Sequence, residues 1–121
     1  MNEKTLERLR AELQSERARL LDEIEEYERD GQENLSEVSG ENNYRDHMAD
    51  QGSATFAREL DMTLEDNARQ LLTQIEGALE RVDTGEYGTC KRCGKPIPVQ
   101  RLEAVPWADL CVECKEWEES R

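Results

Sequence analysis

The sequence of 121 residues predicts an all-α-dominated fold, in which a long antiparallel helical hairpin (a coiled coil) is followed by a small four-cysteine module and a C-terminal helix. Hydrophobic residues make up only 36% of the chain and charged residues 37%, which is typical of long exposed helices rather than of a large globular core. Apolar residues recur at helical spacing in two long segments. Near the C-terminus, four cysteines form two C-x-x-C pairs.

The first arm of the hairpin is expected over residues 2–30. Several of its apolar residues are seven apart, which is the repeat of a coiled-coil seam. The stripe consists of Leu6, Leu9, Leu13, Leu20, Ile24 and Tyr27. Gly31 ends this pattern, and residues 31–53 are polar and contain three glycines. We therefore expect a turn, the tip of the hairpin, over residues 31–53.

The second arm is expected from Ala54 to Asp83, before Gly85, which suits the left-handed position after a helix. Its seam alternates at steps of four and three, and only Asp61 interrupts it. The seam is formed by Ala57, Leu64, Ala68, Leu71, Ile75, Ala78 and Val82, and is widened by Leu60, Leu72 and Leu79. The sequence therefore predicts two domains, the hairpin at 1–83 and the cysteine module at 84–121. We expect a monomer, although the same seam can also pair two chains.

The net charge of −13 lies mainly in the hairpin, since residues 1–83 carry 10 basic and 22 acidic side chains. Such a surface repels phosphate backbones, so we do not expect sequence-specific DNA binding. The acidity favours either solubility alone or a protein partner with a basic groove. The chain has no apolar run of the roughly 18 residues that span a membrane and does not begin as a signal peptide. These features predict a cytoplasmic protein.

The two cysteine pairs, Cys90-x-x-Cys93 and Cys111-x-x-Cys114, are separated by seventeen residues. Each pair can direct two thiolates at one metal, and together they complete the tetrahedron that Zn²⁺ prefers. Gly94 allows the chain to turn back after the first pair. Four protein ligands leave no position for substrate, so the predicted zinc is structural. An iron site with the same ligands, a redox pair and disulfides are the alternatives.

Several apolar residues are available to pack around the metal, namely Tyr87, Ile97, Val99, Leu102, Val105, Trp107 and Leu110. We expect a short hairpin over residues 95–99. A last helix is expected to begin at Cys111, with Trp117 anchored against the helical hairpin.

The string Tyr87-Gly88-Thr89-Cys90-x-x-Cys93-Gly94-x-x-Ile97, followed by Arg101-Leu102-Glu103-Ala104-x-Pro106-x-Ala108-x-x-Cys111-x-x-Cys114, closely resembles the DksA/TraR family of C4 zinc-finger proteins. With the hairpin, the resemblance covers essentially the whole chain. It implies a bacterial protein that binds RNA polymerase by inserting its coiled coil into the secondary channel. An acidic hairpin suits a basic pore of this kind.

In the best-known members the tip carries the motif Asp-x-x-Asp-x-Ala. Here the matching positions are His47, Asp50 and Gly52. One carboxylate of two is kept, and the neighbouring Asp46 is a candidate substitute for the other. Asp50 can instead be a plain helix-capping residue, because Asp50-Gln51-Gly52-Ser53 is also an ordinary turn. We interpret His47 as an exposed turn residue.

Some relatives bind the alarmone ppGpp through basic residues, whose positions here hold Gln74, Val105 and Lys115. Only Lys115 is basic, so we do not expect the same ppGpp site. The leading hypothesis is a non-enzymatic transcription regulator that binds RNA polymerase. The alternative is a zinc-stabilised stress or adaptor protein that docks on another protein. An enzyme is disfavoured, because no nucleophile with a neighbouring base is visible.

Overall fold

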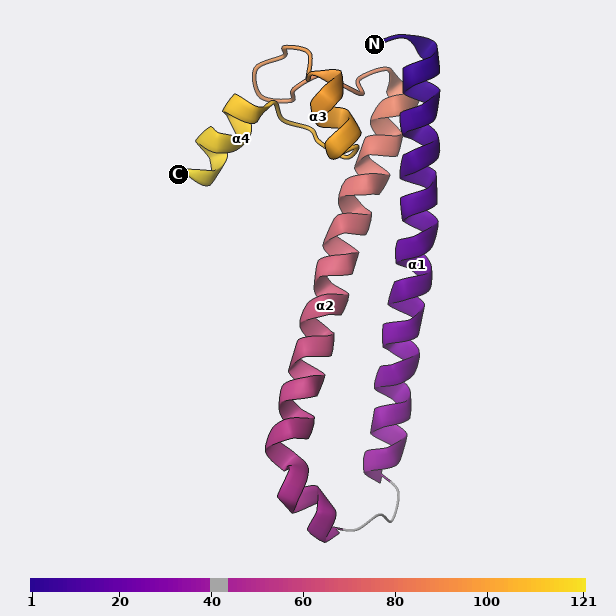
Figure 1. The fold of residues 1–121 in the computed structure, drawn as a ribbon, viewed down its shortest axis with the longest axis vertical. Coiled ribbons are helices and arrows are strands. Elements are labelled where there is room, and N and C mark those ends of the chain that lie inside the picture. Colours follow the sequence, from indigo (N-terminus) through magenta and orange to yellow (C-terminus); the bar gives the residue numbers. More distant parts are fainter. Residues whose placement is uncertain (40–43) are drawn as a thin grey trace. The chain divides into compact units, whose positions relative to one another are not determined.

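The computed structural model describes the backbone of residues 1–39 and 44–121, and the side chains of residues 1–30, 56, 57 and 59–121. The regular elements of these residues are helices (Figure 1). They are α1 (Glu3–Ser39), α2 (Tyr44–Thr84), α3 (Val99–Ala104) and α4 (Val112–Glu119). The mostly helical fold predicted from the sequence is confirmed.

The chain divides into two compact units, and each contains parts of both long helices. Unit 1 comprises Met1–Ala18 and Leu72–Arg121, and unit 2 comprises Arg19–Leu71. In unit 1 the first turns of α1 therefore pack with the last turns of α2 and with the cysteine module. The module shares a unit with the hairpin ends that adjoin it.

The hairpin part of unit 1 is centred on residues of the two predicted seams. Leu9 and Leu13 of α1 and Ile75 and Ala78 of α2 are all 0% exposed. Burying a leucine or isoleucine side chain contributes about 1.5–3 kcal/mol. Salt bridges such as Arg17–Glu76, at 3.4 Å, lie on the exposed side and contribute little. The apolar seam thus provides most of the stability here.

In unit 2 the seam continues with Leu20, Ile24 and Ala68, which are buried. Leu60 and Leu64 were expected in the hairpin core, but they are 48% and 40% exposed. The core of unit 2 is therefore smaller than the sequence pattern suggested, and it leaves part of the apolar surface of α2 exposed.

The long helices extend further into residues 31–53 than the sequence indicated. α1 continues past Gly31 to Ser39, and α2 begins at Tyr44 instead of Ala54. A single glycine within a helix costs only about 1 kcal/mol relative to alanine, so neither Gly31 nor Gly52 needs to end one. Residues 40–43 lie outside the described part of the chain.

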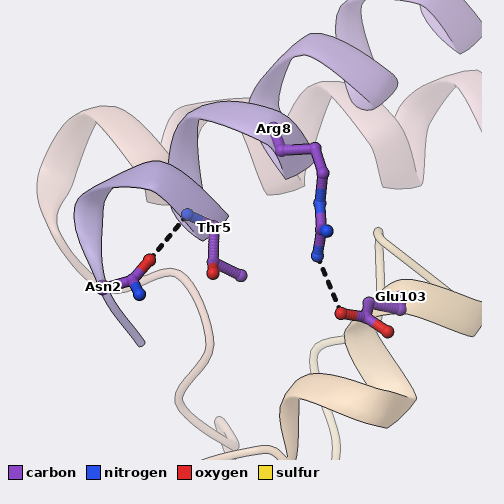
Figure 2. Close-up of polar contacts among 4 residues, drawn as sticks. All are labelled: Asn2, Thr5, Arg8 and Glu103. Atoms are coloured by element: carbon purple, nitrogen blue, oxygen red, sulfur yellow. Dashed lines mark hydrogen bonds and ion pairs between the residues drawn. The ribbon is translucent and has the colours of Figure 1, made fainter.

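The first turn of α1 is capped and tied to the cysteine module by polar side chains (Figure 2). Asn2 Oδ1 accepts a hydrogen bond from Thr5 N–H at 2.8 Å, which satisfies an N–H that has no partner within the helix. From the next turn, Arg8 reaches Glu103 of α3 at 2.7 Å. This pair joins the hairpin to the module within unit 1, although its exposure limits its contribution to stability.

None of the described helices combines the length and the apolar character that crossing a membrane requires.

Candidate metal centre

The first cysteine pair lies on a tight turn that main-chain hydrogen bonds hold closed. Gly94 N–H donates to Cys90 O at 2.9 Å, and Cys90 N–H donates to Lys95 O at 2.9 Å. Gly94 has a φ of 75°, a conformation that residues with a Cβ rarely adopt. This glycine therefore lets the chain reverse directly after Cys93, as the sequence indicated.

The short hairpin expected over residues 95–99 is reduced to a single bridge between Thr89 and Pro96. Pro96 and Pro98 have no N–H to donate, so a ladder of hydrogen bonds cannot continue through them. The chain instead enters α3 at Val99, directly after Pro98.

The second cysteine pair opens α4. Cys111 is the N-cap residue of this helix, and Cys114 lies in its first turn. Lys115 N–H donates to Cys111 O at 2.9 Å, which fixes the two cysteines on one side of the turn. Lys91 N–H donates to Asp109 O at 2.9 Å and so links the first pair to the segment that leads into the second.

The four thiols converge on one point. Their Sγ atoms all lie within 4.8 Å of one another, and those of Cys93 and Cys111 are 3.9 Å apart. Zn–S bonds of about 2.3 Å in a tetrahedron place two sulfurs about 3.8 Å apart. The cluster of Cys90, Cys93, Cys111 and Cys114 therefore fits one zinc ion. With four protein ligands and no open position, such a zinc organises the module rather than activating water or substrate.

The environment of the cluster prepares Cys90 to act as a thiolate. Burial alone would raise the pKa of this thiol, but backbone N–H groups of Cys93, Cys111 and Arg92 outweigh burial and lower the pKa to about 6. Cys114 shows the opposite shift. Arg92 favours its thiolate, yet hydrogen bonds with the neighbouring thiols and burial raise its pKa to about 12. Four crowded thiols resist the loss of all their protons. A divalent cation bound among them favours the fully ionised state.

Side chains hold the segment that connects the two pairs by donating to its main-chain carbonyls. Tyr87 O–H donates to Pro106 O at 2.7 Å, and Arg101 Nε–H donates to Leu110 O at 2.9 Å. Both carbonyls lie in an irregular stretch that forms no helix or sheet of its own, so these donors replace regular secondary structure. Sequence reasoning assigned Tyr87 only to the core and gave Arg101 no structural role.

Most of the apolar residues that were predicted to pack around the metal are buried in the core of the module. Tyr87, Ile97, Leu102 and Leu110 are buried, and Leu102 is fully so. The remaining three are partly exposed, namely Val99, Val105 and Trp107.

Trp117 has a different role from the one predicted. Its side chain is 43% exposed, and two guanidinium groups lie over its ring. Arg92 Cζ is 3.6 Å and Arg121 Cζ is 4.7 Å from the ring centre. The ring thus stacks with arginines of the cysteine module, where an anchor against the hairpin had been expected.

The predicted tip residues lie outside the part of the chain whose side chains are described. The backbone of α2 includes all four positions, Asp46, His47, Asp50 and Gly52. Their assignment as a tip site stays a prediction.

The three positions that match the ppGpp-binding residues of some relatives line one cavity of about 410 Å³ in unit 1, namely Gln74, Val105 and Lys115. The three other cations that line this cavity already have partners, and the first of them, Arg81, donates from Nη2 to Trp107 O at 3.4 Å. Lys91 Nζ is 2.9 Å from a carboxylate oxygen of Asp109, and Arg101 binds a carbonyl.

The fold and the cluster define a class of protein, a helical hairpin that carries a C4-type zinc module. The sequence profile described as "Prokaryotic dksA/traR C4-type zinc finger" matches residues 85–119. The RNA polymerase-binding transcription factor DksA of Escherichia coli K12 is 33% identical over 121 residues, which is all of this chain and 76% of that protein. The chain therefore belongs to the DksA/TraR family, and zinc is the metal that this C4 site is expected to bind.

Two further proteins extend the comparison. The structure of transcription factor DksA2 from Pseudomonas aeruginosa matches with a TM-score of 0.79 and 31% identity, over 100% of this chain and 88% of that one. General stress protein 16O of Bacillus subtilis is 40% identical over 85 residues, which is 69% of this chain. That stretch spans about half, 52%, of the length of the stress protein.

Proposed function

We propose that this protein is a non-enzymatic, monomeric, cytoplasmic regulator of transcription that binds RNA polymerase directly. The main support is the similarity along the whole chain to the E. coli protein, whose name describes it as RNA polymerase-binding. The finer part of the proposal is that the hairpin, with its tip within residues 31–53, enters the secondary channel. In this proposal the zinc module at 84–121 keeps the hairpin ends together and the tip acts on the partner.

The charge of the hairpin supports a protein partner with a basic surface. The chain carries a net charge of −13, and most of the excess lies in residues 1–83. Such a charge weakens any contact with a phosphate backbone and favours a pore lined by Lys and Arg.

The exposed apolar surface of α2 supports the same kind of partner. Phe56, Leu60 and Leu64 are spaced four apart, so they lie along one side of the helix. They are 69%, 48% and 40% exposed. The carboxylates on the two sides of this stripe belong to Glu59 and Asp61, by the 3.6-residue turn of the helix. An apolar stripe bordered by acids is complementary to an apolar groove bordered by bases, whereas a second copy of this chain would oppose acids to acids.

The test is binding of the full-length, zinc-loaded protein to the cognate core RNA polymerase at low salt. We expect a complex that weakens as salt is added, because opposite surface charges are screened. Phe56→Ser is expected to weaken the complex several-fold. Met62→Ser is the matched control, since Met62 is 59% exposed but lies on the opposite side of α2 from Leu60 and Leu64.

If the wild-type protein recovers no polymerase, the proposed function is contradicted. Equal losses of polymerase binding in the Phe56→Ser and Met62→Ser variants would leave polymerase as the partner. They would mean that the stripe is not part of the interface.

The second candidate is a stress or adaptor protein of the same scaffold that docks on another protein. It is favoured by the similarity to the General stress protein 16O and by the departures from the family tip motif at His47 and Gly52. Crosslinks from residues 46–53 that land outside the polymerase channel would support this candidate over the first.

We also propose that ppGpp does not bind at the cavity that contains Gln74. An anion with several negative charges needs clustered donors. Here Gln74 and Val105 replace two of the three bases of the relatives. The other cations of the cavity, Arg81, Lys91 and Arg101, already have partners.

A further inference from the structure

Arg92 lies between two cysteines of the first pair, but its side chain reaches the second pair. Its Nη1 atom donates to the Sγ atom of Cys114 at 3.5 Å. The same guanidinium lies over the ring of Trp117, with Cζ 3.6 Å from the ring centre. One side chain of the first turn therefore contacts both a thiol of α4 and an aromatic ring one helical turn further along α4.

The negative charge of a four-cysteine zinc site explains why a cation at this sulfur is favourable. Four thiolates around one Zn²⁺ leave two negative charges in excess, and Cys114 is almost fully buried, at 3% exposed. A cationic donor at the sulfur partly neutralises that charge and keeps the sulfur oriented toward the metal. Groups that act on a ligand in this way commonly change metal affinity when they are removed.

Trp117 holds the guanidinium in place for this task. A planar guanidinium can present its face to an aromatic ring while the N–H groups at its edge donate elsewhere. The stacking restricts a long side chain that would otherwise lose rotamer freedom in making the sulfur contact. Arg121 also lies over Trp117, 4.7 Å from the ring centre, which offers a comparison within the same molecule.

We propose that Arg92 is a positioning residue of the zinc centre, whose guanidinium holds the Cys114 sulfur and, through Trp117, fastens α4 to the first cysteine pair. Zinc release and detachment of α4 are then coupled. This inference rests on the fit of the four cysteines to zinc and is independent of the proposed polymerase partner.

The test compares zinc transfer from full-length variants to a chromogenic chelator. Arg92→Gln is expected to weaken zinc affinity about tenfold, at the lower end of the range for residues that support metal ligands. Arg92→Lys keeps the charge and should retain part of the affinity. Arg121→Gln removes the other cation over Trp117 and should change the affinity less than about twofold, because Arg121 acts on the ring alone.

A spectroscopic measurement separates an effect on the sulfur from a general loss of stability. In the cobalt-substituted protein, removing an N–H donor from a thiolate should move the sulfur-to-cobalt charge-transfer band to longer wavelength. We expect this shift in Arg92→Gln and not in Arg121→Gln. If Arg92→Gln does not fold, Trp117→Phe, which weakens the stacking but keeps a ring, should show a smaller loss of zinc affinity in the same direction.

Two results would overturn the inference. One is an unchanged zinc affinity and cobalt spectrum in Arg92→Gln. The other is an equal effect of Arg92→Gln and Arg121→Gln, which would mean that the arginines only cover an exposed tryptophan.

Discussion

Single residues in the zinc module carry contacts that no regular element provides. Tyr87 is the clearest case, because its side chain is 7% exposed and its O–H supplies the hydrogen bond to Pro106 O. The carbonyl lies in an irregular segment, so the loss of the donor leaves a buried acceptor without a partner. An unsatisfied buried group of this kind costs about 1–3 kcal/mol.

Tyr87→Phe is therefore expected to lower the free energy of unfolding of the zinc-loaded protein by about 1–3 kcal/mol. The effect should depend on pH. Burial raises the pKa of Tyr87 from 10.0 to about 12, so the hydroxyl stays protonated in the folded protein where the unfolded chain begins to ionise. The contribution is complete below pH 10 and is lost as the pH rises toward 12.

Denaturant unfolding of wild type and Tyr87→Phe at several pH values measures this contribution. The difference between the two proteins should be constant below pH 10 and shrink above it. A difference that grows with pH would contradict the assignment of Tyr87 as a neutral donor.

At the scale of the helices, stability should follow the seam and not the surface charges. Leu13→Ala removes a side chain that is 0% exposed and is expected to cost about 2–5 kcal/mol. Arg17→Ala breaks a pair with Glu76 in which both side chains are more than 40% exposed, and should cost less than about 1 kcal/mol. Denaturant unfolding of the zinc-loaded variants makes the comparison, and similar losses would contradict it.

The sequence could predict the helical elements because each seam repeats one physical pattern many times. Leu9, Leu13 and Ile75 are buried where the pattern put them. The pattern did not predict the helix ends. Gly31 was interpreted as the end of the first helix, although the free-energy cost of one glycine is too small to end a long helix. Leu64 has the right spacing for the core but remains 40% exposed, because spacing alone does not say whether a partner helix covers the position.

The metal centre was more predictable than the contacts around it. Two C-x-x-C pairs can serve one tetrahedral ion almost regardless of what connects them, so the spacing was sufficient. Arg92 and Trp117 are 25 positions apart in the sequence, and no periodic pattern relates them. Trp117 was consequently assigned to the hairpin, whereas its ring stacks with Arg92 and Arg121.

At the scale of the whole molecule, the proposed function assigns polymerase binding and the effect on transcription to different parts of the hairpin. The charged surface and the exposed stripe at Phe56 would serve binding, whereas Asp50 would supply the effect on transcription. This separation predicts that Asp50→Asn, which removes one charge and keeps the shape of the side chain, reduces the transcriptional effect more than it reduces polymerase binding. Asp50 is one acid among 29, so the overall attraction changes little.

The measurement is in vitro transcription with the cognate polymerase, beside binding by the same proteins, with and without ppGpp. Asp50→Asn should bind within about fivefold of wild type, since a single charge among many typically contributes less than about 1 kcal/mol, yet lose most of its effect. Asp46→Asn, compared in the same assays, shows whether the neighbouring carboxylate substitutes for the one missing at His47. Equal losses of binding and effect would mean that Asp50 has no separate role in the effect and that the acting group lies elsewhere on the hairpin; a helix cap is excluded, because Asp50 lies within α2.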